Sequence, residues 1–126
     1  MEKLLFLGMG GFIGTICRYL ISAAFQNYTQ TFFYAATLAV NLAGSLFIGF
    51  LSALFLRESF LHPGFRLFFI TGMLGGFTTF SSFSMETLKL IQQQRFMEAA
   101  AYVFLSISGG LLFAALGWYL SIFITD

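Results

Sequence analysis

A chain of 126 residues in which 59% are hydrophobic and only 9% are charged does not resemble a water-soluble domain, because soluble domains carry about 25% charged residues. A fold this small has too little interior to hide so much apolar surface from water, so the composition predicts a single-domain membrane protein. The net charge of +1 gives no reason to expect a nucleic-acid partner, and a single cysteine, Cys17, excludes a disulfide framework within one chain.

Four stretches are long and apolar enough to cross a membrane as helices, since a spanning helix needs about 20 mainly apolar residues. In chain order we expect them at about residues 4–25, 32–56, 66–92 and 97–124. The first is too long for a cleavable signal and lacks a small-residue cleavage pattern, so we expect it to be retained. The short connections predict an up-down-up-down layout with both termini on one side.

The basic residues divide almost evenly between the two expected sides: Lys3, Arg57 and Arg66 on the side of the termini, and Lys89, Arg95 and, from within the first helix, Arg18 on the other. The positive-inside rule orients membrane proteins through differences of this kind. Two interpretations therefore stay open. Either another feature fixes a weakly specified orientation, or the chain inserts in both orientations, which would permit an antiparallel homodimer.

Small residues recur every four positions in all four expected helices: Gly10 and Gly14; Asn41, Ser45, Gly49 and Ala53; Gly72 and Gly76; Ser106, Gly110 and Ala114. In lipid, helices associate through small residues that permit close backbone approach. We therefore expect each helix to have a packing face.

The third stretch is unusual, because a double glycine near its middle begins the run Gly75-Gly76-Phe77-Thr78-Thr79-Phe80-Ser81-Ser82-Phe83-Ser84. Thr, Ser and Phe are middling helix formers. Irregular backbone at membrane depth is tolerated only where protein buries it or where it faces water or an ion. A break here would be a candidate cation site built from main-chain oxygens. The alternative is a continuous helix whose hydroxyls bond back to the preceding turn.

Phe80 and Phe83 are spaced three residues apart, on one helical face. The positive edge of an aromatic ring can stabilise a small anion without supplying a full charge. Conduction requires such weak, multiple sites, because a full positive charge would trap the anion. The alternative for both rings is ordinary packing.

Asn41 lies midway along the second helix, where its amide can donate to an anion or hydrogen-bond between helices. Further hydroxyl donors are spread over three of the helices, and a file of them could replace the hydration shell of a small anion. They are Thr37, Thr79, Ser81, Ser82, Ser84, Tyr102, Ser106 and Ser108.

Two ionisable residues within the expected helices are functional candidates, because charge inside a membrane is costly. Arg18 lies late in the first helix, where it can snorkel toward the interface or bind a carbonyl. Glu86 follows the third-helix run and can pair with Arg18 or Lys89. No second histidine exists and no serine has an evident base partner, so we expect no enzymatic activity.

Three segments resemble the Fluc (CrcB-type) fluoride channels. The run from Gly75 to Ser84 resembles the family's hallmark GG-x-T-T-F-S-T/S-F-S. Val40-Asn41-Leu42-x-Gly44 is similar to its second-helix V-N-x-x-G, and Gly11-x-x-Gly14-x-x-x-Arg18 to its first-helix G-x-x-G-x-x-x-R. Length and four-helix layout match from end to end.

The resemblance implies an all-α membrane protein of four helices per chain, the third broken mid-membrane, assembled as an antiparallel, dual-topology homodimer with two pores. It implies passive, highly selective export of cytoplasmic fluoride across the inner membrane of a prokaryote, which lowers fluoride toxicity. It also implies a structural Na⁺ at the dimer centre, held by the main-chain carbonyls of Gly75 and Thr78. Since a two-fold axis doubles the carbonyls that one chain can offer, we expect the dimer to be obligate. The expected partners are a second copy and membrane lipid.

The same resemblance gives roles to single residues. Phe80 and Phe83 match the phenylalanine box that lines the pathway, and Asn41 matches the pore asparagine. Arg18 matches the arginine of the entry vestibule, and Glu86 the acid after the motif. The polar track is expected to include Thr79, Ser81, Ser82, Tyr102 and Ser106.

One departure lies in the fourth helix, where some relatives have a serine and this chain has Gly110. Ser106 and Ser108 are the candidates to replace it. Two other classes of protein stay open on the sequence. One is a small multidrug or organic-cation exporter, which needs a membrane-embedded acid, and the other is a structural subunit or assembly factor.

Overall fold

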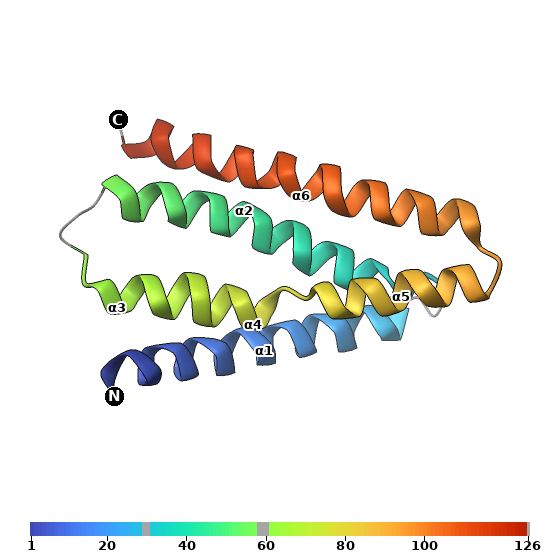
Figure 1. The fold of residues 1–126 in the computed structure, drawn as a ribbon, viewed down its shortest axis with the longest axis horizontal. Coiled ribbons are helices and arrows are strands. Elements are labelled where there is room, and N and C mark those ends of the chain that lie inside the picture. The colour runs from blue at the N-terminus through green and yellow to red at the C-terminus, as the bar shows by residue number, and fades with distance from the viewer. Residues whose placement is uncertain (29–30, 58–60, 126) are drawn as a thin grey trace.

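The structure, a computed structural model, describes residues 1–28, 31–57 and 61–125, and over these ranges all of its regular secondary structure is helical. The elements in chain order are α1 (Glu2–Tyr28), α2 (Ala35–Arg57), α3 (Pro63–Arg66), the π-helical η1 (Leu67–Leu74), α4 (Gly75–Phe77), α5 (Phe80–Gln92) and α6 (Phe96–Thr125). The helices lie side by side in an elongated bundle, and α1 begins at the end where α6 ends (Figure 1).

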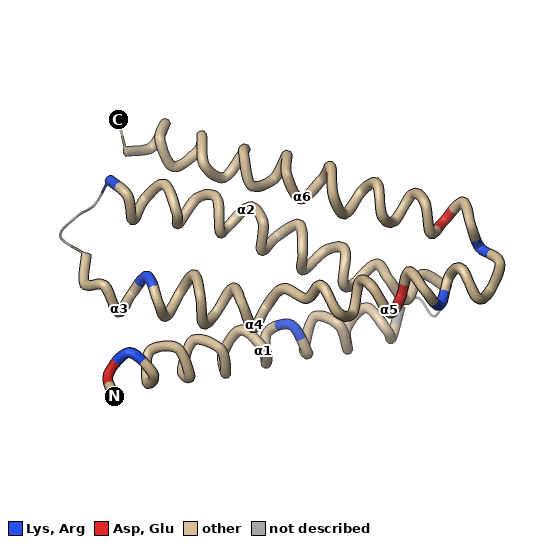
Figure 2. Tube along the Cα trace, in the orientation of Figure 1, with Lys and Arg blue, Asp and Glu red and all other residues tan. Residues whose placement is uncertain are grey.

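Within the described ranges, four stretches are long and apolar enough to span a membrane: Glu2–Asn27, Ala35–Arg57, Pro63–Gln92 and Phe96–Thr125. This number agrees with the sequence prediction. Figure 2 shows the charged residues gathered mostly toward the two ends of the bundle, with one basic position further inside along α1 and one acidic position inside α5. The outward faces carry large exposed apolar side chains, of which Phe123 is 84% exposed. Such faces suit a lipid environment.

Local signals explain where the helices begin. The second span starts at Ala35 rather than near residue 32, because residues 31–34 form a turn in which the Phe32 carbonyl accepts the Ala35 amide at 2.9 Å. α3 begins after His62, whose Nδ1 accepts the Gly64 amide at 3.0 Å. Pro63 follows His62 at a position that suits proline, since its missing N–H is not needed at a helix start.

Small residues set the two closest helix pairs. α2 packs most extensively on α6, and α1 packs on η1 and α4. A Cβ on Gly14 would overlap the Met73 carbonyl oxygen, and one on Gly49 would overlap the Ala114 carbonyl oxygen. The predicted packing faces are confirmed at these positions, because only glycine lets the backbones lie so close.

The third span leaves helical geometry at two residues. Thr78 (φ −84°, ψ 158°) and Thr79 (φ −151°, ψ 117°) are extended and lie between α4 and α5. The Thr79 side chain then caps α5 by accepting the Ser82 amide, as threonine does at helix N-termini. We call these two residues the interruption.

We predict that Gly14→Ala destabilises the folded protein by about 1–3 kcal/mol, the usual cost of overpacking, because α1 has to move away from η1. Gly8→Ala is the matched control, since a Cβ there meets nothing within 4 Å and the gain in helix propensity is the same. Thermal unfolding in detergent measures the difference. Equal melting temperatures for the two variants would contradict the close packing.

Candidate functional site

Asn41 on α2 binds both backbone groups of Thr79. Its Oδ1 accepts the Thr79 amide at 2.8 Å, and its Nδ2 donates to the Thr79 carbonyl at 3.0 Å. The Asn41 side chain thus takes the place of the helical partner that the Thr79 amide loses at the interruption. Asn41 therefore forms hydrogen bonds between two helices, and one proton of its amide is used in the bond to Thr79.

At the interruption, two carbonyls lose the amide donors that they would have in an unbroken helix. In an unbroken helix the Gly75 carbonyl would accept the Thr79 amide and the Thr78 carbonyl would accept the Ser82 amide. The Thr79 amide instead donates to Asn41, and the Ser82 amide donates to Thr79 Oγ1 at 3.1 Å. Gly75 and Thr78 both line one cleft. Main-chain oxygens of this kind are the ligands that hard cations prefer, so the residues fit the Na⁺ that the resemblance implies.

Arg18 reaches the same region from α1. Its Nε donates to the Gly76 carbonyl at 3.0 Å, and the contact is partly buried. In an unbroken helix this carbonyl would accept the Phe80 amide. Arg18 thus binds the backbone directly beside the interruption, which is the carbonyl contact that the sequence analysis left open.

A cleft of about 600 Å³ brings together several of the predicted pathway residues: Asn41, Thr79, Phe80, Phe83 and Ser106. The Phe80 and Phe83 rings lie 5.6 Å apart, and Phe80 is 79% exposed. The Ser106 Oγ is buried and, within the described part of the chain, has no hydrogen-bond partner. The cleft therefore contains two aromatic rings and a hydroxyl whose proton is not committed.

Ser106 and Ser108 differ in position. Ser106 lines the cleft, whereas Ser108 lines an apolar groove between α5 and α6 and donates its hydroxyl to the Phe104 carbonyl. A Cβ on Gly110 would lie 3.5 Å from the Ser45 Oγ, and Ser45 also lines the cleft. Of the two candidates to replace a fourth-helix serine, Ser106 is the one that reaches this space.

A second, polar pocket of about 200 Å³ contains Ser82 and Glu86, with Ser22, Gln26 and Thr37 among its other lining residues. The Glu86 carboxylate accepts two short hydrogen bonds of 2.7 Å, from Thr37 on α2 and Tyr102 on α6. Ser81 and Ser82 both contact Thr79 Oγ1, at 3.3 and 3.1 Å. Thr79 thus links the cleft to the residues of the polar pocket.

The expected ion pair between Glu86 and Arg18 or Lys89 is not observed in the described ranges. Arg18 binds Gly76, and the Lys89 Nζ lies 4.6 Å from the centre of the Phe33 ring. Two hydroxyls satisfy the carboxylate instead. An ion pair was one possible partner for this partly buried acid, and hydroxyl donors from two neighbouring helices serve the same need.

Tyr34, which no sequence pattern singled out, is a further partner of these residues. Its ring lies 4.9 Å from that of Tyr102, and its hydroxyl donates to Glu98 at 3.0 Å. A tyrosine at the start of a membrane helix has an apolar body and a polar tip, and this was the available signal.

A helical bundle of four apolar spans, with a cleft and a polar pocket between its helices, has the architecture of a multi-pass membrane protein. The chain belongs to the CrcB-like family: the model described as CrcB-like protein, Camphor Resistance (CrcB), matches residues 5–118.

Three similar proteins bear the name Fluoride-specific ion channel FluC. The one from Chlorobium chlorochromatii (strain CaD3) is 44% identical over 90% of this chain and 88% of its own length. That from Azobacteroides pseudotrichonymphae is 37% identical over 98% of both chains, and that from Helicobacter pylori (strain HPAG1) is 40% identical over 93% and 91%. The names are those of ion channels, in agreement with the expectation that this chain is not an enzyme.

We predict that Asn41→Leu destabilises the interruption, because it leaves the Thr79 amide unsatisfied, and such a group costs about 1–3 kcal/mol. Hydrogen exchange should show the Thr79 amide losing its protection. Asn27→Leu, at an exposed position near the end of α1, is the control and should leave that amide protected. Unchanged protection in Asn41→Leu would mean that another group holds Thr79.

Proposed function

We propose that this protein is a passive, highly selective fluoride channel of a prokaryotic inner membrane, through which cytoplasmic fluoride leaves the cell and becomes less toxic. One observation carries the proposal. The cleft at the interruption combines the Phe80 and Phe83 rings with the uncommitted hydroxyl of Ser106, in a chain whose relatives are named for fluoride. These names also favour a channel over an organic-cation exporter or an assembly factor.

The chemistry of the cleft suits a small anion. Ring edges and hydroxyl protons carry partial positive charge, and the residues that line the cleft include no lysine or arginine within the described ranges. An anion would therefore meet several weak partners in place of its hydration shell. Weak and multiple sites permit exit as well as entry, as conduction requires.

The polar track in this proposal runs from the cleft to the polar pocket. Thr79 contacts Ser81 and Ser82, and Ser82 lies beside Glu86 in the pocket. Tyr102 extends the track through its hydrogen bond to Glu86. Arg18 is the vestibule residue in this proposal. It donates to the Gly76 carbonyl beside the interruption and does not line the cleft.

The conducting unit is an antiparallel, dual-topology homodimer with two pores, and the interruption lies at mid-membrane. The large exposed ring of Phe80 supports a second copy against this face, and the even division of basic residues permits insertion both ways. A structural Na⁺ on the two-fold axis is held by the Gly75 and Thr78 carbonyls of each chain. The diversion of their helical donors supports this role.

Fluoride efflux from liposomes that contain the purified protein tests the proposal. We expect rapid efflux for the wild type, and a severe loss for Asn41→Asp, which places a carboxylate against the Thr79 carbonyl, and for Phe80→Ile, which removes a ring edge. Phe123→Ile is the matched control, because Phe123 is also highly exposed but lies near the end of α6. A folded, dimeric wild type that transports no fluoride would refute the proposal. Wild-type flux in Asn41→Asp or Phe80→Ile would show that the substituted residue is not part of the pathway.

Removal of sodium tests the cation. We expect protein unfolded and refolded with N-methylglucamine as the only cation to form a dimer that melts at a lower temperature than protein refolded in sodium. The reason is that a ligand bound only by the folded dimer stabilises it by mass action. Identical melting temperatures and dimer yields in the two buffers would argue against a structural Na⁺.

A further inference from the structure

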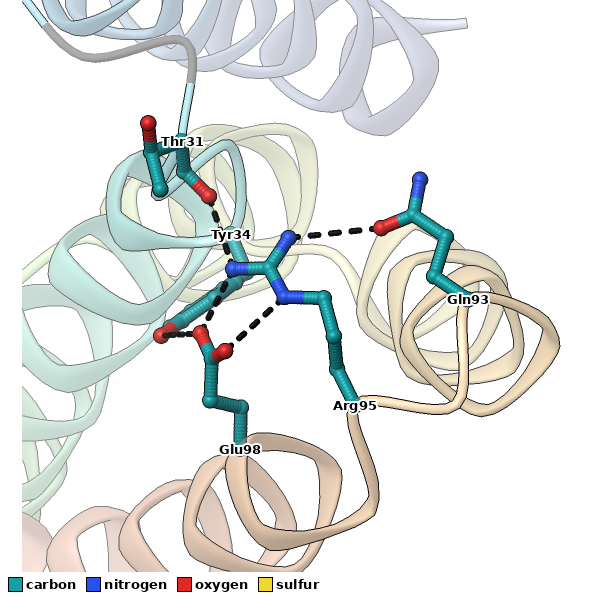
Figure 3. Close-up of polar contacts among 5 residues, drawn as sticks. All are labelled: Thr31, Tyr34, Gln93, Arg95 and Glu98. Carbon is teal, nitrogen blue, oxygen red and sulfur yellow. Dashed lines mark hydrogen bonds and ion pairs between the residues drawn. The ribbon is translucent and has the colours of Figure 1, made fainter.

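Arg95 lies at the centre of a polar cluster at the end of the bundle where α5 turns into α6 (Figure 3). Its Nε donates to Glu98 Oε1 at 2.8 Å, and its Nη2 donates to Glu98 Oε2 at 2.6 Å. The same Nη2 donates to the Thr31 carbonyl at 3.0 Å, and Nη1 reaches Gln93 at 3.3 Å. One guanidinium thus joins the α5–α6 turn to the segment that precedes α2.

The backbone of the turn fixes the position of Arg95. Gln94 has a φ of 60°, in the left-handed region, and its amide donates to the Ile91 carbonyl at 2.9 Å. The Arg95 amide donates to the Leu90 carbonyl at 2.9 Å. This pair of bonds is the Schellman motif that ends many helices. It places Arg95 one helical turn before Glu98, at a spacing that lets their side chains meet.

From Glu98 the contacts lead inward to the polar pocket. Tyr34 donates its hydroxyl to Glu98 Oε2 at 3.0 Å, and its ring lies 4.9 Å from the ring of Tyr102. Tyr102 is 1% exposed and donates to Glu86 at 2.7 Å. Burial, and after it the hydrogen bond to Glu98, raises the pKa of Tyr34, so its hydroxyl stays protonated and remains a donor at physiological pH.

Arg95, Glu98 and Tyr34 themselves line neither the cleft nor the polar pocket. An ordinary surface ion pair has little effect on stability. This pair differs, because the guanidinium binds the carboxylate through two parallel hydrogen bonds and the same carboxylate accepts the hydroxyl of Tyr34, whose ring packs on the buried ring of Tyr102. The cluster can therefore act on the pathway only by holding other side chains in place.

We propose that Arg95, Glu98 and Tyr34 form a positioning unit for the fluoride pathway, which fixes the contact between the Tyr34 and Tyr102 rings and thereby holds the Tyr102 hydroxyl on Glu86. The inference rests on the proposed function. All three are positioning residues, since each acts on the pathway through Tyr102. Losing the unit lets the Tyr102 ring turn, which disorders the polar pocket and slows conduction while the bundle still folds.

If Arg95 instead acted electrostatically, by attracting anions to the pore entrance, the opposite results would be expected. Glu98→Gln would then speed fluoride efflux by removing a negative charge, and Arg95→Lys would leave it unchanged. For the positioning unit both substitutions slow efflux, because neither variant keeps two parallel bonds between a fork and a carboxylate.

The test uses purified full-length protein in liposomes at a low protein-to-lipid ratio, so that most vesicles contain one channel or none. The fraction of vesicles that release fluoride counts the folded, inserted channels, and the rate of release per emptying vesicle measures conduction. The variants are Tyr34→Phe, Glu98→Gln and Arg95→Lys. Gln92→Ala, at an exposed position at the end of α5, is the control.

We expect the fraction of emptying vesicles to match the wild type in every variant. The rate should fall by about tenfold in Glu98→Gln and Arg95→Lys, a change that corresponds to the loss of one hydrogen bond of ordinary net strength. Tyr34→Phe should slow release as well. Combining Tyr34→Phe with Glu98→Gln should add little to the slower single variant, because the two act through one link.

Wild-type rates in the three variants would overturn the inference, as would faster release in Glu98→Gln. A loss confined to the fraction of emptying vesicles would show that the cluster only supports folding.

If the wild type itself released no fluoride, the proposed function would fail instead. The contact chain has its own readout in that case: alkaline titration of Tyr34, from the absorbance of wild type minus Tyr34→Phe, should shift toward the ordinary tyrosine pKa in a Glu98→Gln background. An unshifted titration would overturn the inference.

Discussion

Backbone N–H and C=O groups in apolar surroundings need partners, and the interruption of the third span depends on how this need is met. Two extended residues remove several bonds from the helical ladder. Asn41 binds both backbone groups of Thr79, Arg18 binds the Gly76 carbonyl, and the Thr79 hydroxyl caps the next helix. The interruption is thus held by side chains from two other helices, and the cleft exists only while α1, α2 and the third span keep their register.

That register in turn depends on small residues. α1 approaches the third span so closely that a Cβ on Gly76 would lie 2.6 Å from the Gly11 carbonyl oxygen, and Arg18 reaches its partner from the same helix. Any side chain that separates these helices also moves the guanidinium away from the carbonyl. Packing and polar satisfaction are therefore coupled, and a substitution remote from the cleft can change its shape.

The sequence predicts the four apolar spans and the glycine contacts because both follow from length and spacing within single segments. The partner of Asn41 could not be predicted, since it depends on how α2 lies against the third span, which no spacing within one segment encodes. Glu86 is a second case. An acid in a membrane suggested a cationic partner, whereas hydroxyls from two other helices, at Thr37 and Tyr102, take that place. The resemblance supplied the candidate roles, and the geometry shows which residues meet.

The interruption also divides one helix dipole into two. Aligned peptide units give a helix a partial negative charge at its C-terminus and a partial positive charge at its N-terminus. The third span therefore has a negative end where α4 finishes at Phe77 and a positive end where α5 starts at Phe80, separated by two residues. Under the proposed function the cation lies near the first end and fluoride passes near the second. A single chain segment can then attract ions of opposite sign at neighbouring points through the peptide dipoles of its own backbone.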